Sequence, residues 1–271
     1  MARTCLTGAL TLNISPSGSD TTGDGSAGNP FLTPAGAWNY VRINIDLCSN
    51  PLTFQFANGT YSYAGGVGGS CSGPLVGQNG LTSVKFVGDA NDPTQVVIEP
   101  TNNQPCFSAQ EGAAFCVEGV SMDMSQIVGG FAPGSQAACS MTHGSSMGIG
   151  NVIFGPNPGG IDLQPGIGSR LYCYQSAVPG GFAPGYTINR GGPNAQAYAH
   201  IQGDPAQYTY YGPSAYPDFY ITCTGNPSFD TNFGFFNGGS ACLQNIIING
   251  EITAPSPTWY MIPGSGGVLA D

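Results

Sequence analysis

Charged residues are scarce in this sequence. Asp, Glu, Lys and Arg together make up 7% of its 271 residues, whereas about 25% is typical of soluble domains. Fifteen acidic and five basic residues give a formal net charge of -10. Because so few cations are available to neutralise phosphate, we expect neither nucleic acid nor an anionic membrane as a partner.

Long apolar runs are missing too. The opening from Met1 to Leu12 lacks the apolar stretch of a signal peptide, and no run approaches the roughly 20 residues of a membrane-spanning helix. Nine cysteines and many aromatic residues are nevertheless typical of proteins that work outside the cell. Two interpretations fit: a leader has been removed, or the chain is made in the cytosol as part of a virus particle and released by lysis.

The usual catalytic and metal-binding patterns are also absent. The chain has no Asp-Asp pair and no Cys-x-x-Cys pair, and His143 and His200 have no short-range partner. The best local pair of carboxylates, Glu118 and Asp123, flanks a predicted corner, and a solvated turn role is favoured for Glu118 over an acid or base role. The sequence therefore predicts no catalytic residue, no cofactor and no metal site.

The apolar alternation from Phe115 to Met122 breaks in the middle. Phe115 and Val117 share one face, as do Val120 and Met122, but the second pair is one residue out of phase with the first. Gly119 lies at the break, where it can adopt positive φ without steric cost. The pattern predicts two short strands that meet at a corner.

The same break recurs around Asn151 and Asn245. Asn is the other residue that tolerates the left-handed region. We therefore expect positive φ at Gly119, Asn151 and Asn245.

Copies of the apolar-x-apolar strand recur along the chain at a solenoid-like spacing. They start at residues 54, 84, 115, 147, 171, 199, 221 and 241, which are 20 to 32 residues apart. The pattern predicts an all-β fold, a single-stranded parallel β-helix of about eight rungs. The residues expected to point inward and be buried are Phe54, Phe56, Val84, Phe86, Phe115, Val117, Met147, Ile149, Leu243 and Ile246.

A helix is predicted before the repeats. Thr33 suits the N-cap and Pro34 the first helical position, and an apolar stripe continues to a helix end near Leu47. We expect this helix to cover the unpaired first rung. The domain prediction is residues 1–50 for a strand, loop and capping helix, 51–252 for the β-helix and 253–271 for a tail.

The loop before this helix carries two acidic residues, Asp20 and Asp24. They suggest either a calcium site or an Asx-turn. Calcium needs six to eight oxygen ligands, and the further carboxylates of an EF-hand loop are absent, so the Asx-turn is favoured.

Both ends of the chain resemble a known family. The residues that carry the resemblance are Ile14-Ser15-Pro16-Ser17-Gly18-Ser19-Asp20, Gly28-Asn29-Pro30-Phe31-Leu32-Thr33, Ala57-Asn58-Gly59-Thr60-Tyr61, Ile221-Thr222-Cys223-Thr224-Gly225-Asn226-Pro227-Ser228-Phe229, 233–236 and 262–265. They are similar to pectate-lyase-like right-handed β-helix proteins of tailed bacteriophages, over about 50 residues at each end. The resemblance implies a right-handed parallel β-helix and a tail or head fibre, spike or decoration protein.

Lyases of this family use calcium, held by clustered carboxylates, and a basic residue. Here the basic residues inside the repeats are Lys85, Arg170 and Arg190, and only Lys85 has an acidic neighbour, Asp89, within five positions. The resemblance indicates the fold and leaves activity open, because this fold hosts both enzymes and structural proteins. The missing lyase pattern favours a structural protein over an enzyme.

Three functions follow from these observations. The first is a non-enzymatic structural component of a tailed phage virion, a homotrimer that contacts other virion proteins, contributes to host-surface attachment and is exposed outside the host after lysis. The alternative is a tailspike-type polysaccharide depolymerase, lyase or glycoside hydrolase, whose site spans several rungs. The third is a secreted adhesin.

A tyrosine-rich segment offers a contact surface. Tyr208, Tyr210, Tyr211 and Tyr216 lie close together in sequence, and Tyr is favoured at interfaces because it combines area with a hydroxyl group. A subunit contact is favoured, followed by core filling and then by stacking on host glycan. The segments 129–134 and 180–185 share the sequence Gly-Gly-Phe-Ala-Pro-Gly, which indicates either a binding rim or a reused turn.

Nine cysteines cannot all pair within one chain. The predicted bridges are Cys48 with Cys71, or Cys106 with Cys116, each closing a short loop. Cys173 and Cys223 occupy inward positions and are expected to be reduced core residues.

Overall fold

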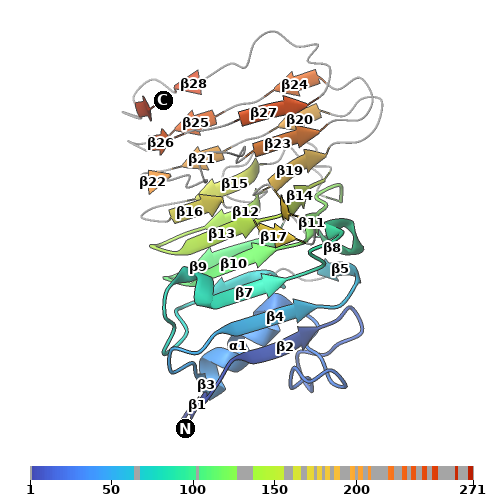
Figure 1. The fold of residues 1–271 in the computed structure, drawn as a ribbon, viewed down its shortest axis with the longest axis vertical. Coiled ribbons are helices and arrows are strands. Elements are labelled where there is room, and N and C mark those ends of the chain that lie inside the picture. The colour runs from blue at the N-terminus through green and yellow to red at the C-terminus, as the bar shows by residue number, and fades with distance from the viewer. Residues whose placement is uncertain are drawn as a thin grey trace.

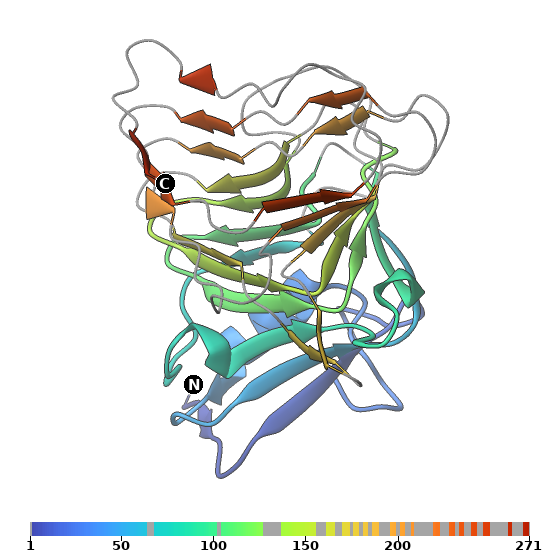
Figure 2. The same ribbon diagram turned by 45° about the horizontal axis from the view of Figure 1, so that its top comes forward.

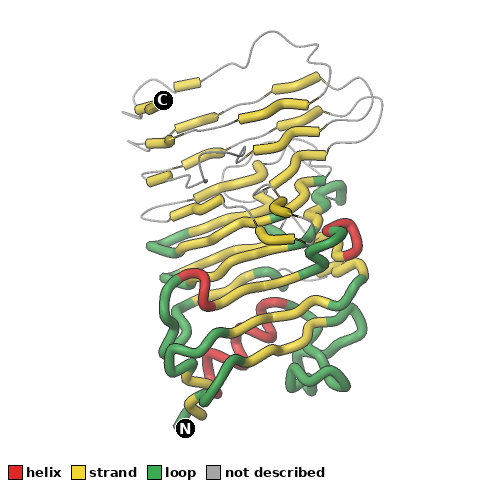
Figure 3. The backbone as a smooth tube through the Cα atoms, viewed as in Figure 1, coloured by secondary structure: helices red, strands yellow, loops and turns green. Residues whose placement is uncertain are grey.

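The computed structural model describes residues 2–63, 68–101, 104–126 and 137–155, and beyond these the backbone of the strands bounded below. These residues form an all-β protein whose main sheets are parallel, which confirms the predicted fold class at this level. Figures 1 and 3 show the strands stacked along the long axis, with β2 near the amino-terminal end.

Three long parallel sheets hold most of the described strands. The first sheet runs β2 (Leu10–Ile14), β4 (Leu52–Phe56), β7 (Val84–Val87), β10 (Ala114–Glu118), β13 (Ser146–Gly150), β16 (Arg170–Cys173), β22 (Gln207–Tyr208), β26 (Ser240–Cys242) and β29 (Val268–Ala270). The second runs β5 (Gly59–Tyr63), β8 (Val96–Pro100), β11 (Ser121–Met122), β14 (Val152–Phe154), β19 (Tyr186–Asn189), β23 (Phe219–Thr222) and β27 (Ile246–Asn249). The third runs β6 (Ser70–Ser72), β9 (Phe107–Gln110), β12 (Ala137–Met141), β15 (Ile161–Pro165), β21 (Ile201–Gly203), β25 (Phe233–Phe235) and β28 (Tyr260–Met261).

Shorter elements complete the described chain. They are α1 (Pro34–Asn44), the 3-10 helices η1 (Leu81–Ser83) and η2 (Pro93–Gln95), the parallel pairs β1 (Thr4–Cys5) with β3 (Ile45–Asp46) and β20 (Gln196–Tyr198) with β24 (Ser228–Asp230), and the antiparallel pair β17 (Ser176–Val178) with β18 (Gly181–Ala183).

The chain enters the three sheets in turn. β4, β5 and β6 belong to the first, second and third sheets, and the same succession follows with β7, β8 and β9, then with β10, β11 and β12. One passage through the three sheets is called a coil below. The tilted view in Figure 2 shows the three sheets around a common interior, and one hydrophobic cluster includes Phe86, Ile98 and Ala109 from the three sheets. Alternate residues of β4, β7 and β8 are buried, which explains the period-two apolar pattern of these strands.

The predicted inward positions are buried. Phe54, Val84, Phe86, Phe115, Val117, Met147 and Ile149 have no exposed surface and Phe56 is 3% exposed. The side chains of Leu243 and Ile246 lie outside the described residues. The prediction is thus confirmed wherever the structure describes it.

The register differs from the sequence alignment in the first coil. Leu52 pairs with Val84, and Phe54 pairs with Phe86, so the first repeat starts at residue 52 and not at 54. A shift of two residues keeps every side chain on the same face, which is why the apolar pattern could not detect it.

Two predicted repeat starts belong to other sheets. Residue 201, in the copy that starts at 199, lies in β21 of the third sheet, and residue 221 lies in β23 of the second. In the coil that contains β23, the first-sheet strand is β22. Its residues Gln207 and Tyr208 carry no apolar alternation. Strands β28 and β29, in the predicted tail 253–271, pair in the third and first sheets.

The predicted corners have positive φ. Gly119, between β10 and β11, has a φ of 65°, and Asn151, between β13 and β14, has a φ of 52°. Asn245 lies outside the described residues. The break in alternation therefore marks the passage from the first sheet to the second.

An aromatic cluster fills the interior of the first coils. The Phe86 ring is stacked on Phe54 with centroids 4.5 Å apart, and it lies 5.1 Å from Phe115 and 5.6 Å from Phe107. Trp38 of α1 contacts Phe54, Phe86 and Phe115 from three successive coils, at 6.3, 6.4 and 5.5 Å. Such pairs each contribute about 0.5–1.5 kcal/mol beyond the burial of their surface.

Helix α1 lies against the amino-terminal edge of the third sheet. Thr33 is its N-cap, and the Thr33 hydroxyl accepts a hydrogen bond from the Gly36 backbone N–H at 3.0 Å. The Trp38 indole N–H donates to the carbonyl of Ser72 in β6 at 3.2 Å. The helix ends at Asn44 because the next residue takes extended dihedrals and enters β3.

Candidate functional site

An ion pair lies on the outward face of the first sheet. The Lys85 ammonium donates to the Glu118 carboxylate at 2.7 Å, and their side chains are 36% and 17% exposed. Residue 85 pairs with residue 116, so Lys85 and Glu118 are diagonal neighbours on adjacent strands. Glu118 is therefore not the solvated turn residue that the sequence suggested.

The sequence could not show this pair because its members are one coil apart. Glu118 is 33 positions from Lys85 in the sequence, whereas the acidic residue within five positions of Lys85 is Asp89. The parallel register brings Glu118 beside Lys85. The side chains of Arg170 and Arg190 and the whole of His200 lie outside the described residues. His143 is exposed, with a φ of 51°.

Asp123 has a local structural role. Its carboxylate accepts a hydrogen bond from the Ser125 backbone N–H at 2.8 Å, two residues further on. This is an Asx-turn. Glu118 and Asp123, the best acid–base pair in the sequence, thus stabilise an ion pair and a turn respectively.

The acidic residues of the amino-terminal loop bind backbone groups. Asp24 accepts from the Ser26 backbone N–H at 2.8 Å, which is the expected Asx-turn, and hydrogen bonds from Ser26 lower the pKa of Asp24. Asp20 accepts from the backbone N–H groups of Leu32 and Thr33, both at 2.9 Å, and from the Thr33 hydroxyl at 2.6 Å. Asp20 therefore fastens the loop to the start of α1.

The structure corrects the predicted disulfides. Cys48 bonds to Cys5, with Cα atoms 5.7 Å apart, and not to Cys71. The pairing of β1 with β3 places Cys5 opposite Asp46, and no apolar pattern in the sequence indicates this two-residue strand. Cys71 instead points into the interior from β6, and burial raises the pKa of its thiol.

Cys106 and Cys116 are buried and do not bond to each other. The Cys106 sulfur lies 3.4 Å from the Met124 sulfur inside the core. Cys116 lies on β10 with its sulfur 3.9 Å from the carbonyl oxygen of Leu81. The two thiols therefore have different surroundings. Cys173 pairs through its backbone with Ile149, while its side chain and Cys223 lie outside the described residues.

The predicted tyrosine contact is only partly described. Tyr208 lies in β22, opposite Leu171, and Tyr210, Tyr211 and Tyr216 lie outside the described residues. Of the repeated segments, 129–134 lies outside as well, and part of 180–185 forms β18 in an antiparallel hairpin.

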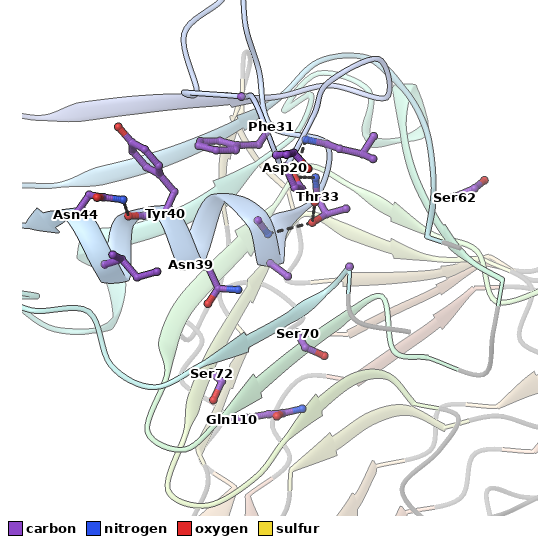
Figure 4. Close-up of a pocket in the computed structure, with 17 residues that line it drawn as sticks. Asp20, Phe31, Thr33, Asn39, Tyr40, Asn44, Ser62, Ser70, Ser72 and Gln110 are labelled. Carbon is purple, nitrogen blue, oxygen red and sulfur yellow. Dashed lines mark hydrogen bonds between the residues drawn. The ribbon is translucent and has the colours of Figure 1, made fainter. Parts of the chain in front are cut away.

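A groove of about 1000 Å³ opens between α1 and the third sheet (Figure 4). It is called the helix groove below. One wall is the outer face of α1, another is the loop that precedes the helix, and the third is formed by β5, β6 and β9. The labelled side chains that line it are Asp20, Phe31, Thr33, Asn39, Tyr40, Asn44, Ser62, Ser70, Ser72 and Gln110.

Most polar groups of the helix groove are uncharged. In Figure 4, Asn39 projects from α1 on the side where Ser70, Ser72 and Gln110 lie. Gln110 donates to the Ser108 hydroxyl at 3.0 Å, and Ser72 donates to Glu111 at 3.1 Å. Sequence reasoning missed the groove because its walls come from residues 20–44, 62–72 and 110, which no short motif connects.

The described residues offer no metal-binding cluster: no group of three or more of their His, Cys, Asp and Glu side chains gathers closely enough to hold a metal ion. Nor does any helix within the described ranges combine the length and apolar character needed to cross a membrane.

Comparison with known proteins gives little. No protein-family model and no curated protein matches the sequence. Among solved structures, pectin methylesterase from carrot is similar over 96% of this chain and 88% of its own, with 10% sequence identity and a TM-score of 0.38. A likeness at this level supports no inference about activity.

Proposed function

We propose that this chain is a right-handed, single-stranded parallel β-helix of about eight rungs, capped by α1, that serves as a non-enzymatic structural component of a tailed phage virion. As a head or tail fibre or a capsid decoration protein, it assembles as a homotrimer, contacts other virion proteins and contributes to host-surface attachment. Its working location is the virion, exposed outside the host after lysis.

The β-helix proposal is supported by the regular succession of the three sheets. Each coil adds one strand to each sheet, so the chain lengthens without starting a new core. Hydrogen bonds from α1 to the edge around β6, such as Trp38 to the Ser72 carbonyl, support the cap. The phage assignment is supported by the resemblance of both ends of the sequence.

The main support for the non-enzymatic role is that Glu118 and Asp123 both make structural contacts. One is held by Lys85 and the other by the Ser125 backbone N–H. Acid–base catalysis at a glycosidic bond needs two carboxyl groups about 5–9.5 Å apart on either side of the bond, with one free to donate a proton. Two carboxylates that serve separate structural contacts do not form such a pair.

The alternative is a tailspike-type polysaccharide depolymerase. One observation favours it: Lys85 and Glu118 bring a basic and an acidic group together on an outward face. We expect no reducing-sugar release from host capsule or pectin, and no change in Glu118→Gln or Asp123→Asn, because Glu118 is paired with Lys85 and Asp123 accepts from the Ser125 backbone N–H. Release by the wild-type chain that either variant abolishes would establish the depolymerase instead.

The virion role is tested on particles purified from a lysate by density gradient. Quantitative mass spectrometry is expected to find this chain in the particles in multiples of three copies, and sedimentation equilibrium of the purified chain is expected to give a trimer. Absence of the chain from the particles overturns the virion role, whereas a stable monomer overturns only the trimer.

A further inference from the structure

The helix groove has the chemistry of a site for neutral sugars. Carboxamide and hydroxyl side chains each carry both hydrogen-bond donors and acceptors, as sugar hydroxyl groups do. Asn39 and Ser70 face the groove, and within the described part of the chain neither side chain has a hydrogen-bond partner. These groups are therefore available to a ligand.

The described lining of the groove carries little charge. Among these residues Asp20 is the one acidic side chain, and it already accepts three hydrogen bonds from Leu32 and Thr33. The described lining includes no Lys or Arg. A phosphate, sulfate or carboxylate ligand would find no cation there, so the fit is to an uncharged ligand.

Apolar surface lies beside these polar groups. Ile43 is 56% exposed and Leu32 is 39% exposed, and both line the groove. Tyr40 also lines the groove, with its ring 5.2 Å from that of Phe31. A pyranose ring presents hydroxyl groups at its edge and C–H groups on its faces, so it needs polar and apolar contacts of this kind in one place.

The size of the groove suits an oligosaccharide. Small-molecule sites have volumes of about 300–1,000 Å³, and the groove, at about 1000 Å³, is at the upper end of this range. We propose that the helix groove binds a neutral oligosaccharide, with Asn39, Ser70, Ser72 and Gln110 as its hydrogen-bonding groups and Ile43 as apolar contact. This proposal does not depend on the virion role, because it concerns the isolated chain.

The test uses the purified full chain on an array of neutral hexose and N-acetylhexosamine oligomers, followed by titration calorimetry with the best of them. We expect the double variant Asn39→Ala/Gln110→Ala to bind it roughly tenfold or more weakly, since each lost hydrogen bond corresponds to about a threefold to tenfold change. Ile43→Ser should also weaken binding.

Matched controls are Asn91→Ala and Val76→Ser. Both residues are exposed, and neither lines the groove. Unchanged unfolding midpoints show that the variants are folded. The proposal is overturned if no neutral oligomer binds, if binding is the same in the groove variants and the controls, or if Ile43→Ser changes only the oligomeric state, in which case the groove is an interface between subunits.

Discussion

Gly119 shares a corner with residues of the coils on either side. A Cβ atom there would lie 2.9 Å from the carbonyl oxygen of Asp89 in the preceding coil. Asn151, in the following coil, donates from its side-chain amide to the carbonyl of Ala90 at 3.1 Å. This hydrogen bond joins the two coils on either side of Gly119, and the missing side chain of Gly119 leaves room for it. The corner therefore requires both positive φ and the absence of a Cβ atom.

A graded series of glycine substitutions separates these two requirements. Gly119→Ala should lower the free energy of unfolding by about 1–3 kcal/mol, because positive φ and the clash with Asp89 both disfavour a side chain. Gly80 has a φ of 80° but open space around it, and Gly8 has open space without a positive φ. Urea unfolding should rank the losses as Gly119→Ala, then Gly80→Ala, then Gly8→Ala. Equal midpoints for the first and last would contradict this account.

Asp89 makes stability depend on pH. The backbone N–H groups of Asn91 and Asp92 donate to its carboxylate at 2.9 and 3.2 Å and lower its pKa. Because the pKa is lower in the folded state, the contribution of Asp89 is fully present above its ordinary pKa of about 3.9 and is lost as the pH falls through the lowered value. The gap in urea midpoint between wild type and Asp89→Asn should be constant from about pH 7 to 5 and shrink below about pH 4. A gap that stays the same at low pH would rule out this role.

At the scale of elements, α1 and the first three coils form one packed unit through their aromatic rings. Phe86 of β7 contacts rings on β4, β10, β9 and α1. Its side chain has no exposed surface. Removal of the Phe86 ring would therefore remove contacts from β4, β9, β10 and α1 at once.

Phe86→Ala should reduce the free energy of unfolding by about 3–5 kcal/mol, since it leaves a cavity among rings that cannot close around it. Phe86→Leu fills part of that space and should cost less, which keeps the test open if the alanine variant does not fold. Urea unfolding followed by near-UV circular dichroism reports the change, because Trp38 lies in the same cluster. Similar midpoints for wild type and the alanine variant would contradict the central role of Phe86.

The Cys5–Cys48 disulfide joins β1 to the segment after β3 across a sequence separation of 43 residues. On the chain-entropy model, a loop of this length corresponds to about 4 kcal/mol of stabilisation. The double variant Cys5→Ser/Cys48→Ser should therefore unfold at lower denaturant concentration, and wild type should fall to the same midpoint in reducing agent. A reducing agent that lowers the midpoint of the double variant as well would point to a bridge elsewhere.

At the scale of the whole molecule, the sequence predicted the parallel sheets and the inward faces because apolar residues alternate in strands such as β4, β7 and β8. It could not predict the pairing of Phe54 with Phe86, since a two-residue shift leaves the pattern unchanged. Strand β22 could not be predicted either, because its residues Gln207 and Tyr208 show no apolar alternation. Contacts between coils, such as that of Lys85 with Glu118, could not be predicted because they join residues that are distant in sequence. The same reason applies to the helix groove.

The reach of Trp38 into three coils implies an order of assembly. Its ring partners are Phe54, Phe86 and Phe115, so the cluster is complete once residue 115 has left the ribosome. Domains generally fold from the amino terminus during synthesis. We expect the amino-terminal coils to be folded while the rest of the chain is still being translated, and their exposed strand edges to serve as the template on which each later coil forms.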